Sequence, residues 1–470
     1  MDAKQANSSF IAFLVAGAFF MEMLDGTVVI SAMPQMADSF GVHPVDLNIG
    51  ISAYLLTLAI LIPASGWVSE RWGARAVFGT AVVVFTVASV LCGLSVNLWT
   101  FTAARILQGV GGAMMVPVGR LIVLRNTPKL DLMRAIATIT WPGLAAPVLG
   151  PPIGGFLATY ASWHWIFFLN LPLGIVAFLL TLRLIPSGKP DGAKPFDFIG
   201  FVLTGAACFG IMYGLDLISR QDSSMPLASI VLAASVGIGV AAVLYAKRTE
   251  HPLVDFWALR IRSFAVTIWG GSLFRVAIGA VPFLLPLMFQ LGFGLDAFQA
   301  GLLVLAVFAG NITMKPFTTA VLRRFSFRRV LLTNGLLNAG VIFACALLTP
   351  ATPTPVVCTL LFAGGLTRSM QFTALNTIAF VDVPEARMSG ANTLFNVAQQ
   401  MSMGLGIGVG AVALRLAGLF NPGKGGAMPL IDFQVAFFVI GAIALIALLD
   451  VVGLHSNAGD EIRLRRAAAR

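Results

Sequence analysis

An apolar stretch from Phe10 to Met33 contains two acidic residues, Glu22 and Asp25. The stretch is long enough to cross a bilayer as one helix, which takes about 20 residues for about 30 Å of hydrocarbon. Placing an acid in such a helix costs roughly 2.5–3.5 kcal/mol on membrane-insertion scales. Because the two acids are three residues apart, they share one face of the helix. Acids inside membranes characteristically face a polar cavity, which the rest of the chain must supply.

The composition identifies a membrane protein with many spans. Of the 470 residues, 58% are hydrophobic and only 11% are charged, whereas soluble domains carry about 25% charged residues. The formal net charge of +10 would indicate nucleic-acid binding in a soluble domain. In a membrane protein the basic residues belong to loops at the cytoplasmic face, so nucleic acid is not a predicted partner.

Charged, proline-rich and glycine-rich breaks divide the chain into fourteen apolar segments, which we expect to be transmembrane helices. The run 389–418 is longer than one span needs, and we expect it to include turns at the membrane surface. Alternate loops are rich in Lys and Arg, for example Arg71 after the second segment and Arg323 and Arg324 after the tenth. The positive-inside rule therefore places both termini in the cytoplasm.

The basic loops after the second and tenth segments form a weak internal repeat, which indicates a duplicated transporter fold. We expect an all-α protein with a six-helix half at 10–185, two inserted helices with their loops at 186–263, a second six-helix half at 264–453 and a cytoplasmic tail at 454–470. No nucleotide-binding G-x-x-x-x-G-K-[ST] motif occurs in the sequence. Active transport would therefore depend on an ion gradient, with no cofactor or metal.

The loop after the second segment contains Gly66, Glu70, Arg71, Gly73 and Arg75 in the pattern G-x-x-x-E-R-x-G-x-R. The glycines allow a tight turn and a close approach of helices beside the charged residues. The alternative interpretation is an ordinary basic loop on the cytoplasmic side.

The fourth segment contains Arg105, followed by Gln108 and Gly109 in the pattern R-x-x-Q-G. A cation this far inside an apolar segment needs an acid or carbonyl partner. Asp25 and Glu22 are the candidates that a six-helix half offers.

The fifth segment contains a glycine- and proline-rich sequence from Gly150 to Gly155. Glycines permit close helix packing and prolines bend a helix by removing backbone hydrogen bonds. The residues of interest are Gly150, Pro151, Gly154 and Gly155.

With these motifs and the sequence from Trp163 to Gly174, the chain resembles the fourteen-spanner drug:proton antiporters of the major facilitator superfamily. The resemblance implies that the Gly66 loop latches the two halves together in the outward-open state, although Ala74 replaces a basic residue of the family pattern. It also implies that Arg105 takes part in proton transfer and that the Gly150 motif belongs to antiporters. Asp25 falls on the first-helix position of this branch.

The second half contains three cations inside apolar segments, Arg275, Lys315 and Arg368, with no obvious acid partner. Two interpretations remain open. Lys315 can extend toward the cytoplasm while the arginines bond helix carbonyls, or all three can line the cavity and attract an anionic substrate.

The thirteenth segment carries a polar stripe at three- to four-residue spacing, which indicates a face directed at the cavity. Its members are Asn392, Asn396 and Gln399.

The predicted function is proton-coupled export of drugs or other small amphipathic molecules by a multi-pass protein of the cytoplasmic (inner) membrane. Asp25 with Glu22 would bind the proton and Arg105 would tune the acid, while Glu22 is also a candidate for setting substrate preference. Beyond substrate, protons and the lipid bilayer no partner is expected, and a monomer should suffice. The alternative is export of a carboxylate metabolite that binds the cations of the second half.

Other classes of protein fit less well. An enzyme should show clustered catalytic side chains, yet the four histidines are scattered. A sensor should carry a soluble output domain, and the sequence shows none. The antiporter motif disfavours a passive channel.

Overall fold

The computed structural model describes residues 3–42, 47–128, 131–187, 195–219, 225–250, 252–295, 297–419, 429–455 and 457–458. Within these ranges all regular elements are helices. They form two compact units, one made of Met1–Phe209, Ser235–Phe256 and Glu385–Val397, the other of Gly210–Ala234, Trp257–Pro384 and Ala398–Arg470. Helices α11, α12 and α17 contribute residues to both units.

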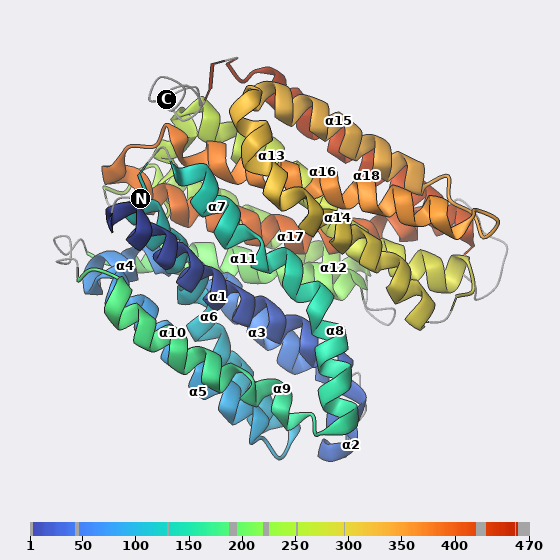
Figure 1. The fold of residues 1–470 in the computed structure, drawn as a ribbon, viewed down its shortest axis with the longest axis horizontal. Helices are drawn as coiled ribbons and strands as arrows, with labels where there is room; N and C mark the ends of the chain where they lie inside the picture. Colours follow the sequence, from blue (N-terminus) through green and yellow to red (C-terminus); the bar gives the residue numbers. More distant parts are fainter. Residues whose placement is uncertain are drawn as a thin grey trace. The chain divides into compact units, whose positions relative to one another are not determined.

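The first unit is built around α1, which packs against α6, α7, α8 and α10, while α5 lies beside α6 and α10 (Figure 1). Its helices are α1 (Ala3–Ser31), α2 (Met33–Phe40), α3 (Asn48–Leu61), α4 (Ser65–Trp72), α5 (Ala74–Gly93), α6 (Leu98–Asn126), α7 (Leu132–Thr140), α8 (Pro142–Tyr160), α9 (His164–Phe168) and α10 (Asn170–Leu184).

In the second unit α14 packs closely against α16, α13 contacts α16 and α18, and α15 lies beside α18 (Figure 1). The remaining helices of the chain are α11 (Phe198–Ser219), α12 (Met225–Ala246), α13 (Arg262–Leu287), α14 (Ala297–Arg324), α15 (Phe327–Cys345), α16 (Thr354–Val381), α17 (Met388–Leu419) and α18 (Leu430–Val452). Short helical turns occupy Phe256–Arg260, Met288–Gly292 and Glu385–Arg387.

Prolines divide two of the predicted segments, 48–68 and 135–159, each of which the sequence predicts as one continuous helix. A 3₁₀ turn at Ile62–Ala64 with Pro63 in it joins α3 to α4, and α8 begins at Pro142 directly after α7 and Trp141. Proline has no N–H to donate, so a new helix can begin at this residue but the preceding one loses a bond.

The prediction of turns within 389–418 is wrong, because α17 is a single helix over this run. Its glycines serve packing and do not end the helix. A Cβ at Gly406 would lie 2.6 Å from the carbonyl oxygen of Val276 on α13, so the two backbones approach closely there. Small residues at such crossings are typical of membrane helices.

Among the described residues, ten helices are long and apolar enough to cross a membrane. They coincide with ten of the predicted segments. The other four predicted segments are the helical regions α7–α8, α11, α15 and α16. The finding establishes a multi-pass helical architecture, while the count of fourteen spans stays a prediction.

Candidate functional site

Asp25 on α1 and Arg105 on α6 form a buried ion pair in the first unit. Nη1 of Arg105 donates to Oδ2 of Asp25 at 2.6 Å, and the two side chains are 1% or less exposed. Asp25 is one of the two candidate partners that the sequence offers for Arg105. Pairing compensates part of the cost of placing each charge away from water.

Gln108, one helical turn after Arg105, bonds to both members of the pair. Its Nε2 donates to Oδ1 of Asp25 at 2.9 Å, and its Oε1 accepts from Nη1 of Arg105 at 2.6 Å. Gln108 is fully buried. The R-x-x-Q-G spacing therefore places a cation and an amide on one face of α6, directed at the same carboxylate.

Asn170 at the start of α10 supplies a further donor to Asp25. Its Nδ2 lies 3.1 Å from Oδ1 of Asp25 and 2.9 Å from Oγ of Ser89 on α5. Ser89 in turn donates to the carbonyl oxygen of Phe167 at 3.0 Å. Asn170 belongs to the Trp163–Gly174 sequence, which by itself indicates only the family resemblance. The sequence signal for its role was a polar amide side chain at the start of an apolar segment.

Glu22 lies one turn before Asp25 on α1 but outside these hydrogen bonds. It is 5% exposed, and neither its Oε2 nor the hydroxyl of Tyr54 on α3 has a hydrogen-bond partner among the described residues. A Cβ at Gly112 would lie 3.5 Å from Oε1 of Glu22 and 3.2 Å from the Tyr54 hydroxyl, so both groups border this glycine. The Arg105 guanidinium stacks over the Tyr54 ring at 4.5 Å.

The predicted antiporter motif lies where α8 crosses α1. A Cβ at Gly150 would lie 2.2 Å from Oγ1 of Thr27, two residues beyond Asp25. Gly154 and Gly155 follow on the same helix, whereas the side chain of Pro151 lies outside what the structure describes. Gly150 therefore permits the close contact that holds α8 against the helix carrying both acids.

The predicted latch begins on α4. Gly66 is buried against Thr393 and Ser389 of α17, and Gly73 ends α4 with a φ of +84°, which favours glycine. Arg75 donates to the hydroxyl of Ser187 and to the carbonyl oxygen of Leu182. Arg71 is exposed.

Glu70 lines a polar hollow of about 300 Å³ in the first unit. The hollow also contains Asp255, which pairs with Arg387 at 2.8 Å. Ser389 and Thr393 of α17 border it as well. The predicted latch residues thus lie beside the beginning of α17, while their function in closing the transporter stays a prediction.

We expect Gly66→Ala to weaken the contact between α4 and α17. The added Cβ would lie 2.3 Å from Oγ1 of Thr393, and overpacking of this kind costs about 1–3 kcal/mol. The purified variant should show a lower thermal midpoint and slower transport than wild type. Gly17→Ala on α1, where a Cβ meets nothing within 4 Å, is the matched control. Equal stability and transport of the two variants would contradict the expectation.

Two of the cations predicted for the substrate cavity have neutral partners in the second unit. Arg275 on α13 donates to the carbonyl oxygen of Thr267 at 2.9 Å and to Oδ1 of Asn376 at 3.3 Å. Lys315 on α14 donates to Oγ1 of Thr373 on α16 at 3.0 Å. The bond from Arg275 to the Thr267 carbonyl agrees with the interpretation in which the arginines bond helix carbonyls.

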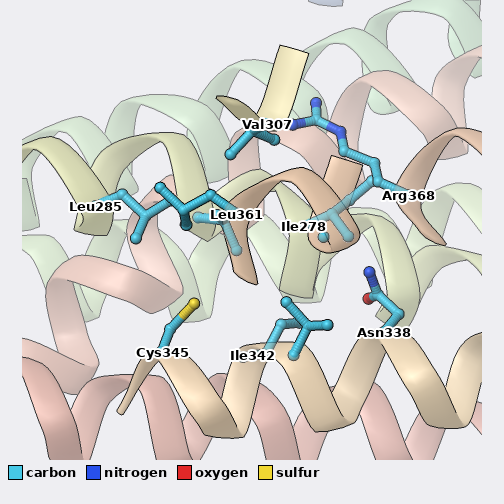
Figure 2. Close-up of a pocket in the computed structure, with 11 residues that line it drawn as sticks. Ile278, Leu285, Val307, Asn338, Ile342, Cys345, Leu361 and Arg368 are labelled. Atoms are coloured by element: carbon cyan, nitrogen blue, oxygen red, sulfur yellow. The ribbon is translucent and has the colours of Figure 1, made fainter. Parts of the chain in front are cut away.

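Arg368 on α16 borders a small cavity of about 30 Å³ (Figure 2). Its side chain extends toward Val307, while the amide of Asn338 lies across the cavity and the rest of the lining is mostly apolar. This volume suits an ordered water and is far below the roughly 300–1,000 Å³ of drug-sized sites.

The asparagines of the polar stripe belong to the first unit. Asn392 donates to the carbonyl oxygen of Pro117 at 2.9 Å, and Oδ1 of Asn396 accepts from Arg120 at 2.9 Å. Gln399 belongs to the second unit. The six predicted substrate residues are therefore divided between the two units, and their role around one substrate cavity stays a prediction.

Arg120 is a buried cation of α6 that is not among the predicted site residues. Its guanidinium also lies 4.9 Å from the centre of the Phe395 ring. The signal was present, because a basic residue three positions after Pro117 interrupts an otherwise apolar run.

The chain belongs to the Major Facilitator Superfamily, whose family model matches residues 15–407. The members of this superfamily are transporters. The putative multidrug resistance protein MdtD of Escherichia coli O6:H1 is 39% identical over 416 residues, which cover 87% of this chain and 86% of the relative. The protein of the same name from Klebsiella pneumoniae (strain 342) is 35% identical over 461 residues, 97% of this chain and 96% of the relative.

Two solved structures share the fold. The human organic anion transporter MFSD10 has a TM-score of 0.66 at 14% identity, covering 96% of this chain and 100% of that one. The proton:xylose symporter XylE has a TM-score of 0.68 at 13% identity, covering 97% of each chain. These likenesses and the family confirm an all-helical major-facilitator fold and a multi-pass membrane protein.

Proposed function

We propose that the protein is a proton-coupled antiporter that exports small amphipathic molecules across the cytoplasmic membrane. The observation that carries the proposal is the buried network in which Arg105, Gln108 and Asn170 surround Asp25. An acid held by donors from two other membrane helices provides a site where protonation and helix movement can be linked. The names of the 35–39% identical relatives support drug-like substrates.

In this proposal the chain crosses the membrane fourteen times, with both termini in the cytoplasm. Two six-helix halves alternate access to a midplane site, as in other transporters built from repeats. The proton gradient is the energy source and no cofactor is needed. One chain forms the transporter.

The test is dye efflux from cells that express the protein, with ethidium as the probe. We expect efflux that stops within the assay when a protonophore collapses the proton gradient while ATP is maintained. Efflux that continues unchanged would contradict proton coupling.

A second candidate is export of an organic anion, favoured by the intramembrane cations of the second unit. Nε of Arg368 has no hydrogen-bond partner among the described residues, and Lys315 has the neutral partner Thr373. An anionic group could satisfy such donors, since guanidinium pairs well with carboxylate.

Substrate competition separates the two candidates. We expect tetraphenylphosphonium to inhibit ethidium efflux severalfold and benzoate to have no effect, because the first unit contains the acids Glu22 and Asp25. The control compares Arg368→Gln with Arg323→Gln at the exposed end of α14. Benzoate inhibition that Arg368→Gln removes and Arg323→Gln retains would favour the anion exporter.

A further inference from the structure

We propose that Glu22 is the carboxyl group that takes up and releases the transported proton, while Asp25 stays ionised as the counter-ion of Arg105. The inference rests on the proposed proton-coupled antiport and assigns different roles to the two acids of α1. It differs from the sequence prediction, in which Asp25 is the main proton-binding residue.

The hydrogen bonds of Asp25 suit a permanent carboxylate. Oδ2 accepts from Arg105, and Oδ1 accepts from Gln108 and Asn170. A carboxylate only accepts, whereas a protonated carboxyl must also donate one bond. All three partner atoms at Asp25 are donors, and the amide oxygen of Gln108 already accepts from Arg105. A proton on Asp25 would therefore have no acceptor among these partners and would displace one of the three donors.

Protonation of Asp25 would also leave Arg105 without its acid. The Arg105 side chain is 1% exposed and the pair is fully enclosed. Removing one member of a buried ion pair costs about 3–5 kcal/mol, because the remaining charge is uncompensated. A proton on Asp25 would incur this penalty in every transport cycle.

Glu22 has the opposite surroundings. Its Oε2 is buried and has no hydrogen-bond partner among the described residues. Among the described residues, the ionisable groups that act on it are Asp25 on its own helix and Tyr54 on α3. Arg105 on α6 lies over the Tyr54 ring and already pairs with Asp25. Cys92 on α5 contacts Gln108 and does not bond to Glu22. The neutral acid therefore loses no ion pair.

The Tyr54 hydroxyl can serve both forms of Glu22. It has no hydrogen-bond partner among the described residues, and a phenol can donate to a carboxylate or accept from a carboxylic acid. In this proposal the hydroxyl donates to the Glu22 carboxylate and, after a small rotation, accepts from the protonated carboxyl group. The Arg105–Asp25 pair is untouched in either direction.

Protonation of Glu22 changes the summed charge of Glu22, Asp25 and Arg105, and this change couples proton binding to substrate binding. With Glu22 ionised, Glu22, Asp25 and Arg105 sum to one negative charge, which attracts a cationic substrate. With Glu22 protonated the sum is zero, and that attraction is lost. Proton and cation therefore exclude each other at one place, as antiport requires.

Infrared difference spectroscopy between low and high pH on the reconstituted full-length protein tests the assignment without a substrate. We expect a carbonyl stretch of a protonated buried carboxyl group that titrates in wild type. The band should disappear in Glu22→Gln, shift in Glu22→Asp and remain in Asp25→Glu. A band that persists unchanged in Glu22→Gln and shifts in Asp25→Glu, or the lack of any such band in wild type, would overturn the proposal.

Transport in the same proteoliposomes distinguishes failure of proton-coupled antiport from failure of the assignment to Glu22. Glu22→Gln should lose uphill ethidium transport driven by a pH gradient and should bind ethidium more weakly, because the glutamine keeps the summed charge at zero, while its thermal midpoint stays near that of wild type. Wild type without gradient-driven transport would contradict the proposed function. Wild type with coupled transport that Glu22→Gln retains in full would contradict only the assignment to Glu22.

Discussion

Asp25→Asn should abolish gradient-driven export, with a loss of more than about a hundredfold. The substitution leaves the Arg105 guanidinium, which is 1% exposed, without an acid. Breaking a buried pair in this way costs about 3–5 kcal/mol. The new amide can also turn a donor toward Gln108 and Asn170, which both donate to this position. Transport in proteoliposomes and thermal unfolding of the purified variant are the measurements.

A double variant separates lost pairing from lost chemistry. Asp25→Asn with Arg105→Gln removes both charges, so the thermal midpoint should recover most of the loss seen in the single variant. Part of the gradient-driven export should also return, because the charges of the site then sum to the same value as in wild type for both forms of Glu22. A single Asp25→Asn variant with wild-type stability and coupled export would contradict the importance of the ion pair.

Gly365→Ala should destabilise the second unit. A Cβ at this position would lie 1.9 Å from the carbonyl oxygen of Val307, and one at Gly310 would lie 2.0 Å from that of Phe362. These atoms belong to the backbones of α14 and α16, so no side-chain rotation can relieve the overlap. Forcing the helices apart should cost at least about 1–3 kcal/mol.

The measurements are the yield of monodisperse protein and its thermal midpoint in detergent. Gly301→Ala is the matched control, because it lies on α14 and a Cβ there meets nothing within 4 Å. We expect a severalfold lower yield for Gly365→Ala and no change for the control. Similar yields and midpoints for both variants would show that the α14–α16 crossing can open at little cost.

The class of protein and the central ion pair could be predicted because both depend on the cost of charge in a membrane. A chain with little charge and long apolar runs must satisfy its backbone hydrogen bonds inside the membrane, which long runs achieve as helices. Arg105 inside such a run needs an acid, and α1 supplies one. Asn170 could not be placed in this way. Its contact with Asp25 joins residues far apart in sequence. Helical periodicity predicts on which face of a helix a residue lies, but it does not predict which residue of another helix it contacts.

The polar stripe of α17 shows the same limit. Its spacing predicts that Asn392 and Asn396 avoid lipid, and both are buried. The periodicity could not show that their amides bond to Pro117 and Arg120 of α6. Nor could it show that glycine-rich α17 remains one helix, because that depends on how closely α13 approaches it.

Simultaneous measurement of substrate and proton flux tests proton-coupled antiport most directly. Purified protein would be reconstituted into vesicles with a pH-sensitive dye inside and no membrane potential. We predict that ethidium moves against its gradient when the proton gradient is imposed, and that adding ethidium speeds the decay of that gradient. Asp25→Asn should show neither effect. Ethidium movement that does not depend on the proton gradient and does not speed its decay would contradict the proposal.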